Sequence, residues 1–267
     1  MSKIACSIAS LSIMVFFFAC KKEESRPLIT DSPTVNKSET GINLKQVAKK
    51  CRVVSIIEPV GSYRADTAVL EYNKWGDPVS VIHYPWPKTG SPNLFFSYDN
   101  KHRLIEARGM YRDNDGEWYK KYFFSGPGGK QAIMDSTYVF PVFQNGVLTW
   151  YYNSYATWIF YDSQGRVIKD SLVDSRWPPV ISHYSYDANG NRTGPFNYDN
   201  KVNPHVTSEI FQFIDRDYSV NNPFVAETYN LEGLPTTLNI PFSVSAPYLH
   251  LPGTPGIRNA TITYDCK

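Results

Sequence analysis

The sequence lacks the residue spacings on which most metal, nucleotide and hydrolase sites depend. None of its five histidines stands at metal-ligand spacing from another histidine, a cysteine or a carboxylate. No Gly-x-Ser-x-Gly elbow is present, and the glycine-rich segment 125–130 lacks the strand–loop–helix context of a phosphate-binding loop. We therefore predict no catalytic residue, no metal ligand and no cofactor, and a non-catalytic protein is favoured over an enzyme.

The sequence also lacks a block of positive charge. Its 27 Lys and Arg nearly balance 25 Asp and Glu, which gives a formal net charge of +2. Binding to nucleic acid depends on clustered Lys and Arg that neutralise phosphates. We therefore expect no nucleic-acid partner.

The N-terminus has the pattern of an export signal. Lys3 precedes an apolar run over 4–19, and Cys20 follows Ala19 directly. The run is shorter than a typical membrane span and contains serines. Residues 1–19 are thus expected to be a signal peptide, and Cys20 the lipidated residue of a lipobox. An ordinary cleaved signal with a chance cysteine is the alternative.

Residues 20–45 are expected to form a lipidated, flexible tether. They are rich in Ser, Thr, Pro, Asn and charge, and such segments bury too little apolar surface to offset the entropy of ordering. The segment 21–24 (Lys-Lys-Glu-Glu) resembles the export tag of Bacteroidota-type surface lipoproteins. This resemblance implies an outer-membrane location, with the cell surface as the expected side and the periplasmic face as the alternative.

Cysteine is scarce, and its placement suggests one disulfide. Of four cysteines, Cys6 lies in the predicted signal and Cys20 takes the lipid. Cys51 and Cys266 remain, at the start of the first predicted strand and the end of the last. An oxidising compartment favours a disulfide between them, and two buried free thiols are the alternative.

The composition of residues 46–267 indicates one all-β domain. The chain has 19 Tyr, 15 Phe and 6 Trp, which favour strands, and 19 Pro and 16 Gly, which favour turns. All-β domains of this length occur as single units.

A turn motif recurs along this domain. Its clearest copies are 161–166 (Tyr-Asp-Ser-Gln-Gly-Arg) and 186–191 (Tyr-Asp-Ala-Asn-Gly-Asn). The Asp side chain can accept from backbone N–H groups, and Gly adopts a positive φ at little cost. Apolar residues alternate on both flanks, which predicts antiparallel hairpins in a meander. Weaker copies begin at Tyr72, at Tyr98 with His102 in the glycine position, and at Tyr229; 125–130 occupies a similar place without the Tyr.

These units resemble the YD repeats of Rhs-type surface proteins, and more closely those of small, uncharacterised Bacteroidota-type lipoproteins. The resemblance spans about 72–229, with irregular spacing and degenerate copies. It implies a sheet of hairpins added side by side. Rhs proteins are far longer and often end in a toxin domain, so a fragment of a toxin-delivery shell is the third-ranked function.

The remaining segments complete the expected fold. We predict one short N-terminal helix over 43–50, and final strands near 236–240 and 260–264. The segment 197–222 is less regular, with a short helix or loop around Phe211, Phe213 and Ile214. The proline-rich segment 241–256 is expected to be a loop.

Tryptophan is the one excess that suggests binding. Sheet packing is the favoured interpretation, and an exposed row that stacks on sugars or grips a partner is the alternative. Trp75 and Trp86 lie near turns and prolines and are the expected exposed pair. The leading function is a membrane-anchored β-sheet scaffold that binds a protein or envelope component. A carbohydrate-binding protein or glycan hydrolase ranks second.

Overall fold

The computed structural model describes residues 50–267, apart from 60–65, 86–90, 112–115, 127 and 242–248. The predicted signal peptide, Cys20, the tether 20–45 and nearly all of the predicted helix 43–50 lie outside these residues, as does Trp86. The fold below is that of the unit Gly41–Lys267.

The described chain is mostly antiparallel β-structure, as predicted. In chain order the strands are β1 (Cys51–Ile57), β2 (Thr67–Tyr72), β3 (Pro78–Tyr84), β4 (Asn93–Tyr98), β5 (Leu104–Met110), β6 (Gly116–Phe124), β7 (Ala132–Val139), β8 (Val142–Gln144), β9 (Val147–Trp150), β10 (Asn153–Tyr161), β11 (Val167–Asp174), β12 (Trp177–His183), β13 (Thr228–Tyr229), β14 (Pro235–Asn239), β15 (Leu249–Leu251), β16 (Thr254–Ile257) and β17 (Asn259–Cys266). A 3-10 helix η1 (Pro204–Thr207) and an α-helix α2 (Glu209–Asp215) lie between β12 and β13.

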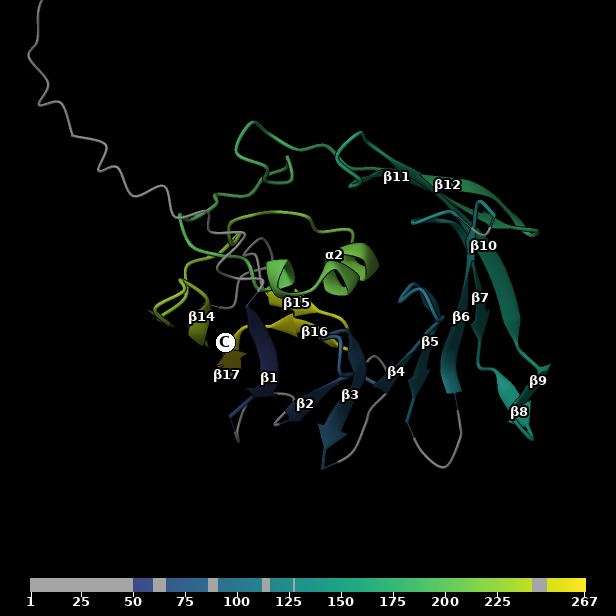
Figure 1. The fold of residues 1–267 in the computed structure, drawn as a ribbon, viewed down its shortest axis with the longest axis horizontal. Coiled ribbons are helices and arrows are strands. Elements are labelled where there is room, and N and C mark those ends of the chain that lie inside the picture. The colour runs from purple at the N-terminus through teal and green to yellow at the C-terminus, as the bar shows by residue number, and fades with distance from the viewer. Residues whose placement is uncertain (1–49, 60–65, 86–90, 112–115, 127, 242–248) are drawn as a thin grey trace, which may run out of the picture. The chain divides into compact units, whose positions relative to one another are not determined.

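Thirteen of these strands form one sheet, with the order β12-β11-β10-β7-β6-β5-β4-β3-β2-β1-β17-β14-β13. From β1 to β12 each strand pairs with the next in sequence, apart from the small β8–β9 hairpin set between β7 and β10. The C-terminal strand β17 then pairs antiparallel with β1, Cys51 opposite Cys266. The meander is thus extended past its first strand by the end of the chain, and β17 lies directly beside β1 in Figure 1.

One face of the sheet carries the core. Alternating residues of the strands are buried, as in β4, where Leu94 and Phe96 are buried and their neighbours are more exposed. In Figure 1 the strands from β1 to β10 follow one another around α2. Phe211 of α2 is fully buried, and Phe213 packs on Tyr122 of β6 with ring centres 5.4 Å apart. Of the helix or loop expected around Phe211, the structure thus has the helix.

The prediction of a loop over 241–256 is wrong in its second part. Leu249–Leu251 and Thr254–Ile257 form the β15–β16 hairpin, and its leucines are buried. Gly253 in the hairpin turn has φ of +79°, and a Cβ added there would come within 2.9 Å of Leu94. The hairpin forms because it covers the core of β3 and β4, which its proline content does not reveal.

Candidate functional site

The turns on one side of the sheet form a row, here called the turn edge. Four of them share a hydrogen-bond pattern that the β6–β7 turn lacks. In the β10–β11 turn, Oδ1 of Asp162 accepts from the backbone N–H groups of Gln164 and Arg166, both at 2.9 Å. Gly165 has φ of +80° and donates its N–H to the Asp162 carbonyl. The same two Oδ1 contacts recur at Asn73, Asp99 and Asp187.

The arginine of the motif closes two of these turns with an ion pair. Nε of Arg166 donates to Oδ2 of Asp162 at 2.8 Å, and Arg103 does the same to Asp99 at 2.7 Å. Burial alone would raise the pKa of Asp162, but hydrogen bonds from the backbone and side chain of Arg166 outweigh it and lower the pKa. These carboxylates are therefore structural anions, engaged within their own turns.

Four tyrosines of the motif tie their turns to the preceding strands. The Tyr98 hydroxyl donates to the Pro78 carbonyl at 2.6 Å, and Tyr161 to the Ala132 carbonyl at 2.7 Å. Tyr72 and Tyr186 make equivalent bonds. In the other direction, the Arg103 guanidinium lies 4.2 Å from the Phe124 ring centre. The turns thus form a continuous, cross-linked edge.

Helices η1 and α2 lie beside this edge and are held by caps. The side chain of Asn203 accepts from the His205 N–H at the start of η1, and that of Ser208 accepts from Ile210 at the start of α2. At its C-terminus, α2 ends at Arg216 with φ of 55°. These polar residues explain why a helix of only seven residues forms at this position.

A buried histidine connects the start of η1 to the end of α2. Nδ1 of His205 lies 2.9 Å from Oδ1 of Asn203, and Nε2 lies 2.9 Å from Oδ2 of Asp215. Both neighbours are acceptors, so both ring nitrogens donate and the ring is cationic. Burial alone would lower the pKa of His205, but the hydrogen bond to Asp215 and the charge of Asp217 outweigh it and raise the pKa.

Arg216 fixes the other side of α2 to the sheet. Its Nε lies 3.5 Å from Oδ2 of Asp170 in β11, and its Nη2 lies 3.8 Å from Oδ2 of Asp135 in β7. Lys120 of β6 approaches the second oxygen of Asp135 at 3.6 Å. Because Asp135 is fully buried, removing either cation would leave a poorly compensated charge.

Between the turn edge and the two helices lies a groove of about 790 Å³. The turns of β4–β5, β6–β7 and β10–β11 supply one wall, and η1 and α2 supply the other. Its aromatic lining consists of Phe124, Tyr161, Phe213 and Tyr218. Its basic lining consists of Lys101, His102, Arg103, Lys130 and Arg166, against one acidic residue, Glu209. This volume is in the range of small-molecule binding sites.

Of the two predicted binding tryptophans, Trp75 lies next to this groove. It is 60% exposed, and its ring meets the ring of His102 edge-on at 4.2 Å between centres. Lys74 lies over the same ring, with Nζ 4.3 Å from its centre. Trp86 is outside the described residues. The sequence named Trp75 as exposed only under the alternative to core packing, and gave no indication that a groove begins beside it.

The favoured packing role for tryptophan is wrong at most described positions. Trp75, Trp150, Trp158 and Trp177 are all exposed, whereas Trp118 packs partly against the core. Trp158 and Trp177 belong to β10 and β12, near one end of the sheet. Alternation alone cannot tell which face of a strand is covered.

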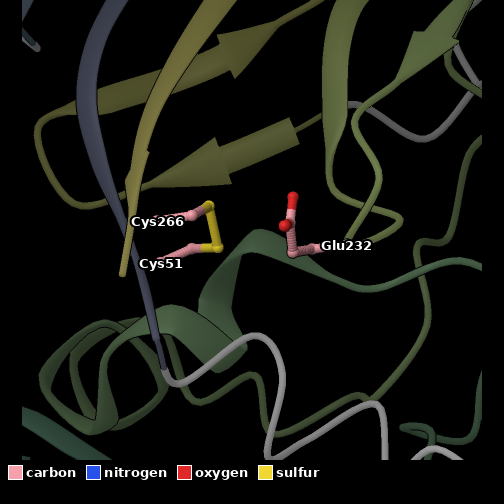
Figure 2. A group of neighbouring side chains, drawn as sticks. All are labelled: Cys51, Glu232 and Cys266. Atoms are coloured by element: carbon pink, nitrogen blue, oxygen red, sulfur yellow. A yellow bond between two sulfur atoms is a disulfide. The ribbon is translucent and has the colours of Figure 1, made fainter.

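The two predicted cysteines are bonded. The S–S distance between Cys51 and Cys266 is 2.02 Å, and the bond spans 215 positions of sequence. Figure 2 shows the carboxylate of Glu232 beside this disulfide. Because each sulfur is bonded to the other, neither is a thiolate, and this group of side chains does not provide the donor set of a metal site.

A second histidine–carboxylate pair is buried under the sheet. Nδ1 of His83 lies 2.6 Å from Oδ2 of Asp66, and Nε2 of His83 has no hydrogen-bond partner among the described residues. The adjoining cavity, lined also by Ser91 and Thr254, has a volume of about 10 Å³. That space suits a single water molecule and excludes a substrate.

No helix in the described part of the chain combines the length and apolar character that a membrane span requires. No protein-family model matches this chain, and no curated protein matches it.

Proposed function

We propose that this chain is an outer-membrane lipoprotein, anchored through Cys20, whose β-domain binds a protein or an envelope component without transforming it. The groove between the hairpin turns and α2 is the observation that supports binding. Its walls are fixed by the capped helices and the cross-linked turns, and a preorganised wall reduces the entropy lost on binding. Neither buried pair, His83–Asp66 or His205–Asp215, lines the groove.

The anchor is tested by lipid labelling. Cells that express the full chain or its Cys20→Ser variant are grown with an alkyne-tagged fatty acid. We expect label on the full chain and none on the variant, and extracellular protease should remove the protein from intact cells. Equal labelling of both chains would exclude Cys20 as the lipidated residue, and protection from protease would favour the periplasmic face.

Binding in the groove is tested by site-specific cross-linking in cells. A photo-reactive amino acid is placed at Gln164, which lines the groove, or at Lys121, which is exposed on β6 outside it. We expect a discrete cross-linked species from position 164 and none from position 121. Identical products from both positions, or none from 164, would contradict the proposal.

A carbohydrate-binding protein or glycan hydrolase is the second candidate function. The observation that favours it is Trp75, an exposed indole beside a groove that contains further aromatic residues. A screen of the full chain against envelope glycans separates the two forms of this candidate. Binding without released sugar supports a binding protein, whereas released product supports a hydrolase.

A further inference from the structure

We infer that the groove and Trp75 together bind an anionic polysaccharide, with a sugar ring on Trp75 and carboxylate groups of the glycan in the groove. This inference rests on the proposed binding function and names the class of ligand. It follows from three features: an exposed aromatic platform, an excess of positive charge, and planar amide groups beside aromatic rings.

The exposed Trp75 ring, the aromatic platform, extends the groove beyond its own walls. His102 lines the groove, and Trp75 packs against its ring, so the two aromatic rings continue the lining outward. His102 has φ of 61° where the other turns have glycine. A non-glycine residue is disfavoured in that backbone conformation. The turn therefore retains a side chain at this position at some cost, and that side chain supports Trp75.

The charge of the groove favours an anionic ligand. Basic residues outnumber acidic ones along the groove, and Lys74 adds a positive charge over the Trp75 ring. Asp99 and Asp162 pair with Arg103 and Arg166, and Asp77 lies 3.9 Å from His102. With these carboxylates and Glu209 included, five lysines and arginines stand against four carboxylates. Lys130 is exposed at the β6–β7 turn and provides a flexible ammonium group.

The remaining lining suits sugar hydroxyl groups. Gln164 belongs to the turn wall and Gln212 to the helix wall, and each amide offers a donor and an acceptor. Phe213 and Tyr218 supply apolar surface for the C–H faces of sugar rings. An acidic peptide would use the charge but would leave no role for the exposed platform, so the glycan is favoured.

The experiment measures binding of the full chain, purified in detergent, to three polymers. Polygalacturonate carries sugar and charge, its fully methyl-esterified form has the same sugar without charge, and poly-glutamate has charge without sugar. We expect polygalacturonate to bind at least about tenfold more tightly than either other polymer, and added salt to weaken it.

Two groove variants and two matched controls locate the site. Trp75→Ala and Lys130→Gln should each weaken polygalacturonate binding about five- to tenfold. Two control variants should leave polygalacturonate binding unchanged. Trp177→Ala removes an indole that is 69% exposed on β12, and Lys121→Gln changes an exposed residue of β6 outside the groove. All four residues lie at the surface, and thermal melting checks that each variant is folded.

Three results would overturn the inference. Equal binding of the esterified polymer would exclude charge recognition, and equal binding of poly-glutamate would point to an acidic peptide. No binding of any polymer would exclude the anionic glycan while leaving the proposed binding function to the cross-linking result at position 164. If Trp177→Ala weakens binding as much as Trp75→Ala, the site lies elsewhere.

Discussion

The two ends of the thirteen-stranded sheet differ in how they are covered. We call β1–β3, β17 and β14 the closed end. It buries Val53, Ile56 and Ile262, and a disulfide joins β1 to β17, the first and last strands of the chain. At the open end, β10–β12, six of the seven residues of β12 are exposed. The same hairpin pattern therefore exists with and without a covering layer.

The difference shows where the stability of each end originates. Burial of apolar area dominates at the closed end, at roughly 25 cal/mol per Å². At the open end, Trp158, Phe160, Val180 and Ile181 stay exposed and gain little of this energy. There β12 depends on its pairing with β11 and on the Asp162 and Tyr161 contacts of the neighbouring turn, whereas β10 and β11 still bury Ile159 and Val167.

Removal of the disulfide should have the largest effect on the closed end. A double Cys51→Ala, Cys266→Ala variant loses a link across 215 positions, which in the chain-entropy model is worth about 5 kcal/mol. Urea unfolding of both chains measures this loss. The reduced wild-type chain is the control and should lose a similar amount. A loss below about 1 kcal/mol would show that packing alone holds β1 to β17.

Truncation of valine to alanine should lower the free energy of unfolding by different amounts at the two ends of the sheet. Val81 in β3 is fully buried, and Val81→Ala should cost about 2 kcal/mol through lost transfer energy and a cavity. Val180 in β12 is 58% exposed, and Val180→Ala should cost less than about 0.5 kcal/mol. Equal losses, measured by urea unfolding, would mean that something covers β12 in solution.

Substitution of Asp162 should destabilise the open end more than the rest of the sheet. Asp162→Ala leaves two backbone N–H groups without their acceptor and should cost about 1–2 kcal/mol. Asp162→Asn keeps the acceptor oxygen and loses only the charge pairing with Arg166, so it should cost less. Amide hydrogen exchange should speed up in β10–β12 and stay unchanged in β1–β3. A uniform increase would argue against independent opening of the two ends.

Substitution of His205, which lies beside the closed end, should have the smallest effect on the free energy of unfolding. This effect should depend on pH. Folding raises its pKa above the ordinary value of 6.5, so its contribution is fully present below that pH and is lost as pH rises through the folded pKa. The stability difference between the wild type and His205→Gln should shrink from about pH 6 to about pH 9. A difference that grows with pH would show that His205 is neutral in the fold.

Local signals in the sequence predicted the hairpin turns of this fold. Asp162 and Gly165 define a turn through side-chain acceptance and positive φ, and both effects act within five residues. The cysteine count likewise left Cys51 and Cys266 as the candidate pair. Trp75 was named as an exposed candidate, under the alternative to core packing, because it lies near a turn. Such features need no knowledge of distant segments.

Only the tertiary structure decided which faces are covered and where a groove forms. Apolar side chains occur in both β3 and β12, yet α2 and the β15–β16 hairpin cover the sheet unevenly and leave β12 exposed. The groove depends on Asp215 and Arg216 meeting His205, Asp135 and Asp170 from other elements. Local sequence sets turns and strand faces because those interactions are short-range, whereas the covering of a face depends on contacts between residues far apart in the chain.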